Sequence, residues 1–111
     1  HANSSNDPSV NGAMFYAPSS ANSYLSADVI SASNTLASTM LSFYCSTTGL
    51  ANKGVLQDDN MTGINWSTNP VALLELGFMT NPTDDANMQD DTYQQLMVRG
   101  IADGIDAYFG R

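Results

Sequence analysis

Glu75 is the residue of this sequence with the clearest potential for chemistry. It lies within the apolar run Val-Ala-Leu-Leu-Glu-Leu-Gly-Phe, residues 71–78, which is typical of a strand covered on both faces in an α/β sheet. A carboxylate buried there is costly unless a cation, a metal ion or hydrogen-bond donors compensate it. Glu75 also falls near the carboxyl end of that strand, where α/β folds open their ligand crevices. We therefore expect Glu75 to be catalytic or to face a metal ion.

Basic side chains that could neutralise Glu75 are scarce. The 111 residues contain three Lys plus Arg against 11 Asp plus Glu, which gives a formal net charge of −8. A purely structural salt bridge from Glu75 would have to use Lys53 or Arg99, and the sequence leaves that alternative open. The acidic balance argues against nucleic acid and anionic lipid surfaces as partners, because both need a basic footprint.

His1 is the only imidazole in the chain, and its role is ambiguous when it is taken alone. A copper site of the histidine-brace type needs a second His, which the sequence does not contain. A Ser-His-Asp triad is formally possible, but no Gly-x-Ser-x-Gly turn accompanies it. A terminal His can also be the remnant of a purification tag.

The other reactive residue types favour structural roles. The Asp pairs at 58–59, 84–85 and 90–91 do not match the Asp-x-Asp-x-Asp-Gly spacing of a calcium loop, and two of them are placed to cap helices. The single Cys45 cannot form an internal disulfide and is interpreted as a small core residue. Trp66 either lines a groove, where it could stack on a sugar, or packs in the core.

Hydrophobic periodicity predicts the elements that must position these residues. Residues 12–17 form a strand that stops at Pro18, residues 60–66 form a weak strand or loop, and residues 70–79 form the strongest strand. A helix is predicted over residues 20–48, and Gly49 is a plausible end for it. Its apolar positions recur at helical spacing and are Leu25, Val29, Ala32, Leu36, Met40 and Phe43.

Two further helices are predicted after the strongest strand. Asn81 and Pro82 suit an N-cap followed by the first helical position. A long helix follows over residues 91–109, where Gly100 and Gly104 lie beside its apolar stripe and suggest a close approach to a sheet. The stripe itself consists of Tyr93, Met97, Ile101, Ile105 and Tyr108.

This order of elements predicts one α/β domain with a mainly parallel twisted sheet flanked by helices. No apolar run approaches the roughly 18 residues of a membrane span, and no interdomain linker is evident. A strand apolar on both faces needs helices above and below it. The chain supplies about half of that cover, so we expect it to be the C-terminal portion of such a fold.

Four segments, taken together and in order, resemble the zinc-dependent N-acetylmuramoyl-L-alanine amidases, the type 3 cell-wall amidases of bacteria and phages. The most specific segment is Asn-Pro-Val-Ala-Leu-Leu-Glu-Leu-Gly-Phe-Met-Thr-Asn-Pro, residues 69–82. The others are His-Ala-Asn at 1–3, Lys-Gly-Val at 53–55 and the closing helix at 100–109. The similarity covers nearly the whole chain and matches the C-terminal half of the family's catalytic domain.

The resemblance implies a function and roles for two residues. Members of the family hold one zinc through two His and one Glu, with water in the open position, and hydrolyse the amide between N-acetylmuramic acid and L-alanine. His1 matches the last zinc ligand, at the point where the family has a Ser-Leu-His-Ala-Asn motif, and Glu75 matches the catalytic carboxylate. The other two ligands come from upstream strands in the family. We therefore expect residues 1–111 to form the C-terminal part of one catalytic domain and to be inactive alone.

The implied partners are peptidoglycan and whatever supplies the remaining ligands, either the N-terminal half of the domain or a companion chain. The implied location is secreted, in the cell wall, and the sequence does not distinguish a bacterial autolysin from a phage endolysin. Two alternatives remain open at this point. One is a non-catalytic peptidoglycan-binding relative, and the other is a small structural domain in which Glu75 pairs with Lys53.

Overall fold

Strands and helices alternate along the chain, as the sequence predicts. The computed structural model describes residues 1–111. Its elements are β1 (Ala13–Ala17), α1 (Ala27–Thr48), β2 (Asn52–Gln57), α2 (Thr62–Asn65), β3 (Leu73–Glu75), α3 (Pro82–Gln89) and α4 (Asp91–Tyr108). The α/β class is confirmed. None of the helices combines the length and the apolar character that a bilayer crossing demands.

The sheet has the order β2-β1-β3, with β1 parallel to β2 and antiparallel to β3. The N-terminal segment extends it beyond β3. The His1 backbone nitrogen donates to the Leu74 carbonyl at 2.9 Å, the Leu76 N–H donates to the His1 carbonyl at 2.9 Å, and Asn3 forms a parallel bridge with Phe78. Two of the three pairings are therefore parallel, and β3 lies between β1 and residues 1–3.

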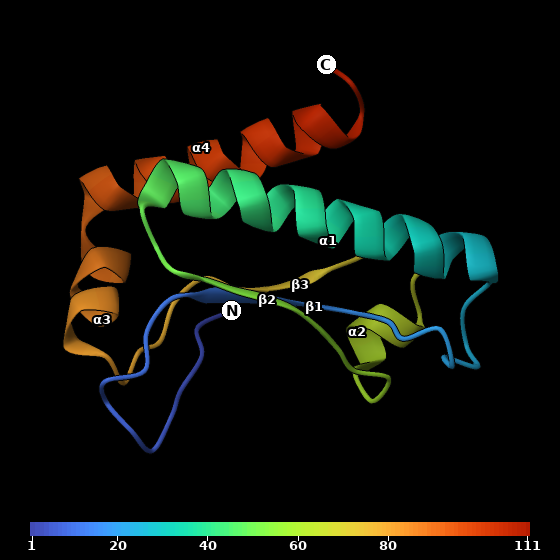
Figure 1. The fold of residues 1–111 in the computed structure, drawn as a ribbon, viewed down its shortest axis with the longest axis horizontal. Helices are drawn as coiled ribbons and strands as arrows, with labels where there is room; N and C mark the ends of the chain where they lie inside the picture. Colours follow the sequence, from blue (N-terminus) through green and yellow to red (C-terminus); the bar gives the residue numbers. More distant parts are fainter.

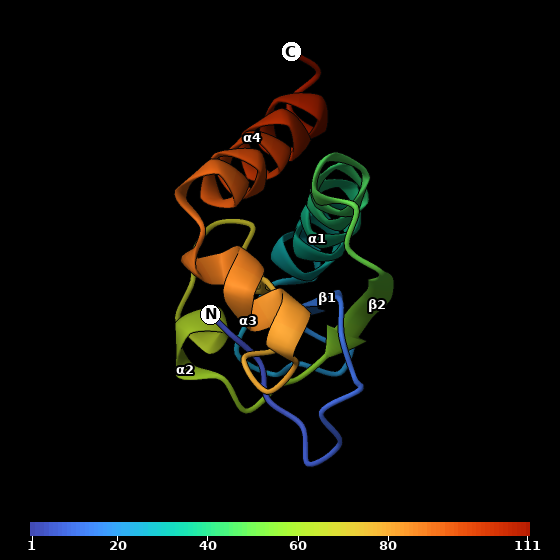
Figure 2. The ribbon, with the colours of Figure 1, turned by 90° about the vertical axis from the view of Figure 1, so that its left-hand side faces the viewer.

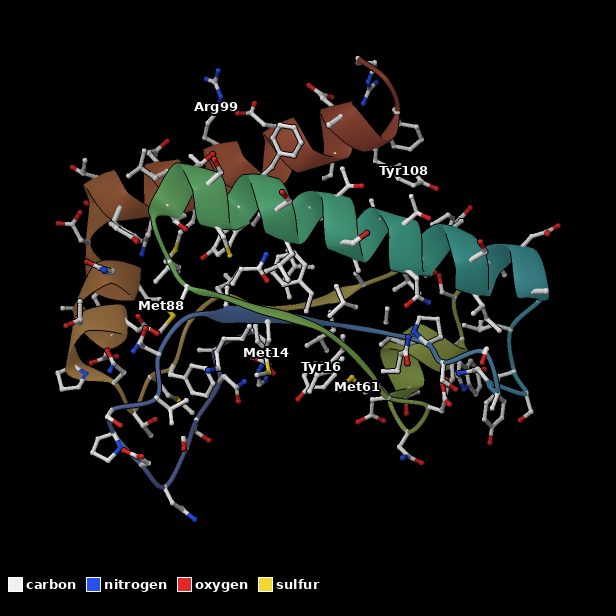
Figure 3. The ribbon with its side chains drawn as sticks, in the orientation of Figure 1. Met14, Tyr16, Met61, Met88, Arg99 and Tyr108 are labelled. Atoms are coloured by element: carbon white, nitrogen blue, oxygen red, sulfur yellow. The ribbon has the colours of Figure 1, made fainter.

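Helices cover one face of this sheet. Figures 1 and 2 show α1 lying over the strands and α4 packed beside α1, with α3 at one end of the molecule. The core between these layers holds Phe15, Leu41 and Tyr44, each with at most 2% of its surface exposed. Met14 and Tyr16 alternate with the buried residues of β1 and point away from α1 (Figure 3). Glu75 pairs with Met14 across the strands, so it belongs to the open face.

The strand expected over residues 70–79 is much shorter in the structure. Pro70 has no N–H to donate, and the Val71 N–H bonds to the Ser33 hydroxyl of α1 at 2.9 Å instead of to a strand. Pairing with β1 ends at the Met14–Glu75 pair. The strand is therefore shorter than expected, while the place of Glu75 at its carboxyl end is confirmed.

The buried face of α1 is displaced from the apolar stripe that periodicity predicts. Phe43 is 41% exposed, whereas Ser33, Ala37 and Tyr44 are fully buried. Small and polar residues such as Ser33 and Ala37 give no hydrophobic signal, although the sheet packs directly against them. The N-cap is Ser26 and Gly49 ends the helix at φ 76°, in the left-handed region where glycine is favoured.

Gly100 and Gly104 approach a helix, not a sheet. A Cβ built on Gly104 would lie 2.7 Å from the Met40 Cα, and one on Gly100 would lie 2.9 Å from the Tyr44 Cα. The two glycines therefore let α4 pack closely against α1. Residues 60–66 differ from expectation as well, since Thr62–Asn65 form the short helix α2 with Ile64 buried beneath it.

Candidate functional site

The structure brings His1 and Glu75 together. The His1 Nδ1 lies 3.0 Å from the Glu75 Oε2 across 74 positions of sequence. The backbone ladder fixes this contact, because His1 bonds to Leu74 and Leu76, the residues on either side of Glu75. Side chains opposite each other in adjacent strands share a face, so the imidazole and the carboxylate emerge side by side. The two residues singled out in the sequence therefore lie side by side and make up the candidate site.

The two partners differ in their exposure to solvent. Glu75 is 7% exposed as a residue, whereas the His1 side chain is 68% exposed. Burial raises the pKa of the Glu75 carboxyl. A carboxylate with a raised pKa and an open neighbour is better suited to taking up a proton than one held in a strong ion pair.

The alternative salt bridges of Glu75 do not form. Arg99 pairs with Asp103 at 3.0 Å on the exposed side of α4, and Lys53 is an exposed residue of β2. The only ion pair of Glu75 is the one with His1. The structural alternative based on Lys53 or Arg99 is therefore wrong.

Tyr44 supports this site from the helix layer, and sequence reasoning missed it. Its hydroxyl donates to the Leu76 carbonyl at 2.8 Å, directly after Glu75. Burial raises the pKa of the Tyr44 phenol, which keeps the hydroxyl protonated and available as a donor. A tyrosine among the Ser and Thr residues of α1 carries no local signal of a partner 32 positions away.

Residues of this chain alone do not make a complete metal centre. No group of three or more His, Cys, Asp or Glu side chains lies close enough together to hold a metal ion. His1 offers one ligand: its Nε2 makes no hydrogen bond to the protein, while Nδ1 faces Glu75. This donor set fits part of a three-ligand zinc site and would need two further ligands from outside residues 1–111.

The remaining candidates take structural positions. Cys45 is buried at the edge of the core, and burial raises the pKa of its thiol, which disfavours the nucleophilic thiolate. Asp90 caps α4 by accepting from the Tyr93 N–H, and Asp59 accepts from Ser19 and Asn22. Trp66 is 83% exposed, so the expectation of core packing is wrong.

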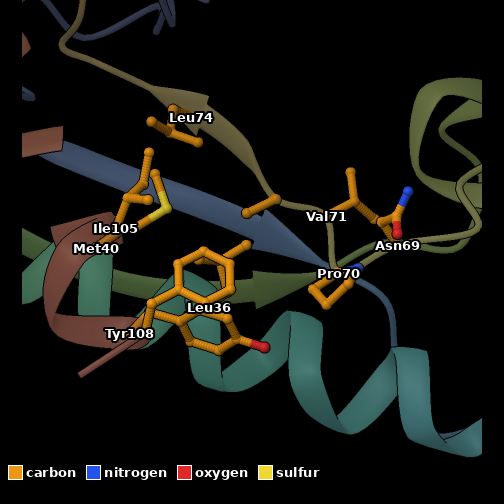
Figure 4. Close-up of a pocket in the computed structure, with 10 residues that line it drawn as sticks. Leu36, Met40, Asn69, Pro70, Val71, Leu74, Ile105 and Tyr108 are labelled. Carbon is orange, nitrogen blue, oxygen red and sulfur yellow. The ribbon is translucent and has the colours of Figure 1, made fainter. Parts of the chain in front are cut away.

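The largest hollow in the surface lies away from His1 and Glu75. It is an apolar groove of about 590 Å³ between α1, the end of α4 and the segment leading into β3, shown in Figure 4. Leu36, Met40, Leu74, Ile105 and Tyr108 line it. Leu74 points to the helix side of β3 and Glu75 to the other, and the groove holds no carboxylate, imidazole or thiol. Its lining is therefore apolar, unlike the surroundings of His1 and Glu75.

Comparison with known proteins identifies the family to which this chain is related. The sequence model of the N-acetylmuramoyl-L-alanine amidase family matches residues 1–107. A probable cell wall amidase of Staphylococcus aureus, LytH, is 37% identical over 60 residues, which cover 54% of this chain and 20% of that protein. The match therefore spans only about a fifth of the length of that relative.

Solved structures show the same relationship over nearly the whole chain. The catalytic domain of the amidase CwlV from Bacillus (Paenibacillus) polymyxa var. colistinus is 33% identical with a TM-score of 0.81, covering 99% of this chain and 55% of that one. The amidase AmiC2 of Nostoc punctiforme is 28% identical with a TM-score of 0.80, covering 100% of this chain and 56% of that one. The chain thus spans about half the length of these structures, and it belongs to the N-acetylmuramoyl-L-alanine amidase family.

Proposed function

We propose that this chain is the C-terminal part of the catalytic domain of a peptidoglycan hydrolase. The reaction is hydrolysis of the amide that joins the lactyl group of N-acetylmuramic acid to L-alanine. The observation that carries the proposal is the 3.0 Å contact between His1 and Glu75 at the end of β3, in a chain whose residues 1–107 match the amidase family.

Glu75 is the general base in this proposal. Its position at the last residue of β3 leaves the carboxylate at the rim of the sheet, where a water molecule can approach. The carboxylate takes a proton from the attacking water as the water oxygen bonds to the scissile carbonyl carbon. When the carbon–nitrogen bond then breaks, the protonated Glu75 delivers that proton to the departing amine of L-alanine, which leaves the carboxylate as it began.

His1 is one of the zinc ligands in this proposal. When bound, zinc polarises the scissile carbonyl and lowers the pKa of a coordinated water to about 7. The residues of this chain hold the His1 ring in place: its backbone pairs with β3, and Nδ1 meets the Glu75 carboxylate. A carboxylate beside a ligating imidazole also fixes the orientation of the ring.

The substrate and the other ligands follow from the same proposal. Peptidoglycan is the polymer that carries the scissile amide, so the protein acts in the cell wall after secretion. A second His and a Glu ligand come from the remainder of the domain or from a companion chain. Residues 1–111 alone are therefore proposed to be inactive.

The test uses the natural protein that carries this chain and purified peptidoglycan. We expect new α-amino groups on L-alanine, no new reducing sugar ends, loss of activity with a zinc chelator and recovery with zinc. His1→Ala is expected to lose zinc, and Glu75→Gln to keep zinc and lose turnover. Peptidoglycan binding without release of L-alanine would favour the non-catalytic relative instead, and hydrolysis by isolated residues 1–111 would contradict the incomplete site.

A further inference from the structure

Asp84 is the second buried carboxylate of the chain and has no part in the reaction described above. It is 3% exposed and lies in the first turn of α3, after the N-cap Asn81 and Pro82. An acidic residue there normally faces solvent and favours the helix dipole. In this fold it points inward, and no Lys, Arg or His forms an ion pair with it.

Two backbone N–H groups take the place of a cation. The Asp84 Oδ2 accepts from the Gly12 N–H at 2.9 Å and from the Phe78 N–H at 3.0 Å. Hydrogen bonds to a charged acceptor are stronger and more directional than those between neutral groups. One oxygen therefore joins two segments that lie 66 positions apart.

Each of these segments leads to one neighbour of β3. Gly12 precedes β1, in which Met14 pairs with Glu75. Phe78 follows β3 and bridges to Asn3, two residues after His1. This bridge consists of two hydrogen bonds, since the Asn3 N–H donates to the Gly77 carbonyl and the Asn3 carbonyl accepts from the Met79 N–H, both at 2.8 Å. The carboxylate of Asp84 thus ties together the segments that flank Glu75 on both sides.

The backbone around this carboxylate leaves little freedom for another arrangement. Gly12 adopts φ 106°, and a Cβ on it would lie 2.5 Å from the Ala51 carbonyl oxygen, so only glycine fits there. A Cβ on Gly77 would lie 3.5 Å from the Asp84 Oδ2, an ordinary van der Waals distance. The restriction therefore applies to Gly12, whose N–H donates to Asp84.

From these contacts we infer that Asp84 is a positioning residue for the site, which sets the separation of His1 and Glu75 by holding Gly12 and Phe78 on one oxygen. The inference rests on the proposed amidase function for its catalytic readout. It assigns Asp84 no contact with substrate.

The test compares three variants in the natural protein that carries this chain. Asp84→Ala removes the acceptor, Asp84→Asn keeps an acceptor oxygen of the same reach, and Asp85→Ala removes a neighbouring carboxylate from the same helix turn. The Asp85 side chain accepts one hydrogen bond, from Gln89 of its own helix. Turnover is measured per folded molecule, well below the unfolding transition, together with KM and zinc content.

We expect Asp84→Ala to lower kcat at least tenfold with KM within twofold and zinc retained, and Asp84→Asn and Asp85→Ala to stay within threefold of the unaltered protein. A merely structural residue would lower the melting temperature without this selective fall in kcat. Unchanged kcat in folded Asp84→Ala, or a loss in Asp84→Asn as large as in Asp84→Ala, would overturn the inference. If Asp84→Ala does not fold, Asp84→Glu replaces it, and its longer carboxylate must lower kcat while Asp84→Asn preserves it.

A second readout does not depend on hydrolysis. The ¹⁵N resonances of the His1 ring report its hydrogen bond to Glu75, and we expect them to move toward those of a free imidazole in Asp84→Ala but not in Asp85→Ala. Unmoved resonances would contradict the inference even in an active enzyme. Absence of L-alanine release by the unaltered protein would instead contradict the proposed function, while the resonances would still decide the role of Asp84.

Discussion

Glu75 and Asp84 are the two buried carboxylates of this chain, and they differ in what their oxygens contact. Asp84 is 3% exposed, and one of its oxygens accepts hydrogen bonds from two backbone N–H groups, so it is held by the backbone. Glu75 is 7% exposed, and its side chain has one partner, the largely exposed ring of His1. Similar burial therefore accompanies two different roles. Glu75, whose partner is an exposed imidazole, is the carboxylate proposed to exchange a proton, and Asp84, whose Oδ2 accepts from two backbone N–H groups, is the one inferred to hold the backbone.

The largest expected effect is the loss of catalysis when the Glu75 carboxylate is replaced by an amide. Glu75→Gln keeps the size of the side chain and removes the base, so we expect kcat for peptidoglycan hydrolysis to fall about 10²- to 10⁴-fold. The free energy of unfolding should change by less than about 1 kcal/mol, because only one partly exposed contact is altered. Amino-group release and denaturant unfolding measure the two quantities. Activity within tenfold of the unaltered protein would remove Glu75 from the role of base.

The next largest effect is the loss of stability expected when the Asp84 carboxylate is removed. Asp84→Ala leaves the Gly12 and Phe78 N–H groups without an acceptor, and each unsatisfied buried donor costs about 1–3 kcal/mol. We expect the free energy of unfolding to fall by about 2–4 kcal/mol, and by much less in Asp84→Asn. Urea denaturation measures both variants against Asp85→Ala. Equal losses for Asp84→Ala and Asp85→Ala would show that the helix dipole, not the paired N–H groups, explains the role of Asp84.

A third substitution alters the contact between α1 and α4 and tests whether a loss of stability alone lowers kcat. Gly104→Ala places a Cβ 2.7 Å from the Met40 Cα, so α4 must move away from α1 at a cost of about 1–3 kcal/mol. We expect lower thermal stability with unchanged kcat. Gly63→Ala is the matched control, because nothing lies within 4 Å of its added Cβ. A fall in kcat for folded Gly104→Ala would mean that the helix layer also positions Glu75.

The smallest effect concerns the contact between that helix layer and β3. Tyr44→Phe removes the hydrogen bond to the Leu76 carbonyl, and we expect it to cost about 0.5–1.5 kcal/mol at pH 7. Burial raises the pKa of Tyr44 in the folded protein, while the unfolded chain ionises near its ordinary value of about 10. The free energy of unfolding should therefore stay constant below about pH 10 and fall above that pH. Above it, the unfolded chain releases the Tyr44 proton while the folded protein keeps it.

The alkaline loss should be smaller in Tyr44→Phe than in the unaltered protein. It should not vanish, since burial also raises the pKa of Tyr93. Chemical unfolding at a series of pH values between 7 and 11 measures the difference between the two proteins. Parallel pH profiles would contradict the assignment of the alkaline sensitivity to Tyr44.

The sequence predicts helix ends and helix repeats where the interactions join residues close together in the chain. Asn81 and Pro82 begin α3 and Gly49 ends α1, because caps satisfy backbone groups within a few residues of themselves. The long helix at Asp91–Tyr108 followed from its apolar repeat. The apolar repeat of α1 does not predict its buried face, since Ser33 and Ala37 are buried without contributing to that repeat.

Part of the site was also predictable. An acidic residue inside an apolar run with only three cations in the chain pointed to Glu75, and the order of motifs pointed to His1. Tyr44 and Asp84 were not recognised as supports of the site. Their partners lie 32 positions from Tyr44 and 72 and 6 positions from Asp84, and neither composition nor periodicity describes such pairings.

The sequence by itself determined the α/β class, the end of α1 at Gly49, the start of α3 at Asn81 and Pro82, and the one glutamate with the potential for chemistry. These properties follow from local propensities, repeats and charge, which are written in neighbouring residues. Only the tertiary structure decided which group meets Glu75, which face of the sheet stays open and why an aspartate in a helix turn is buried. Those outcomes depend on strand register and on the packing of segments far apart in the chain, where a shift of one residue in register would turn Glu75 to the other face.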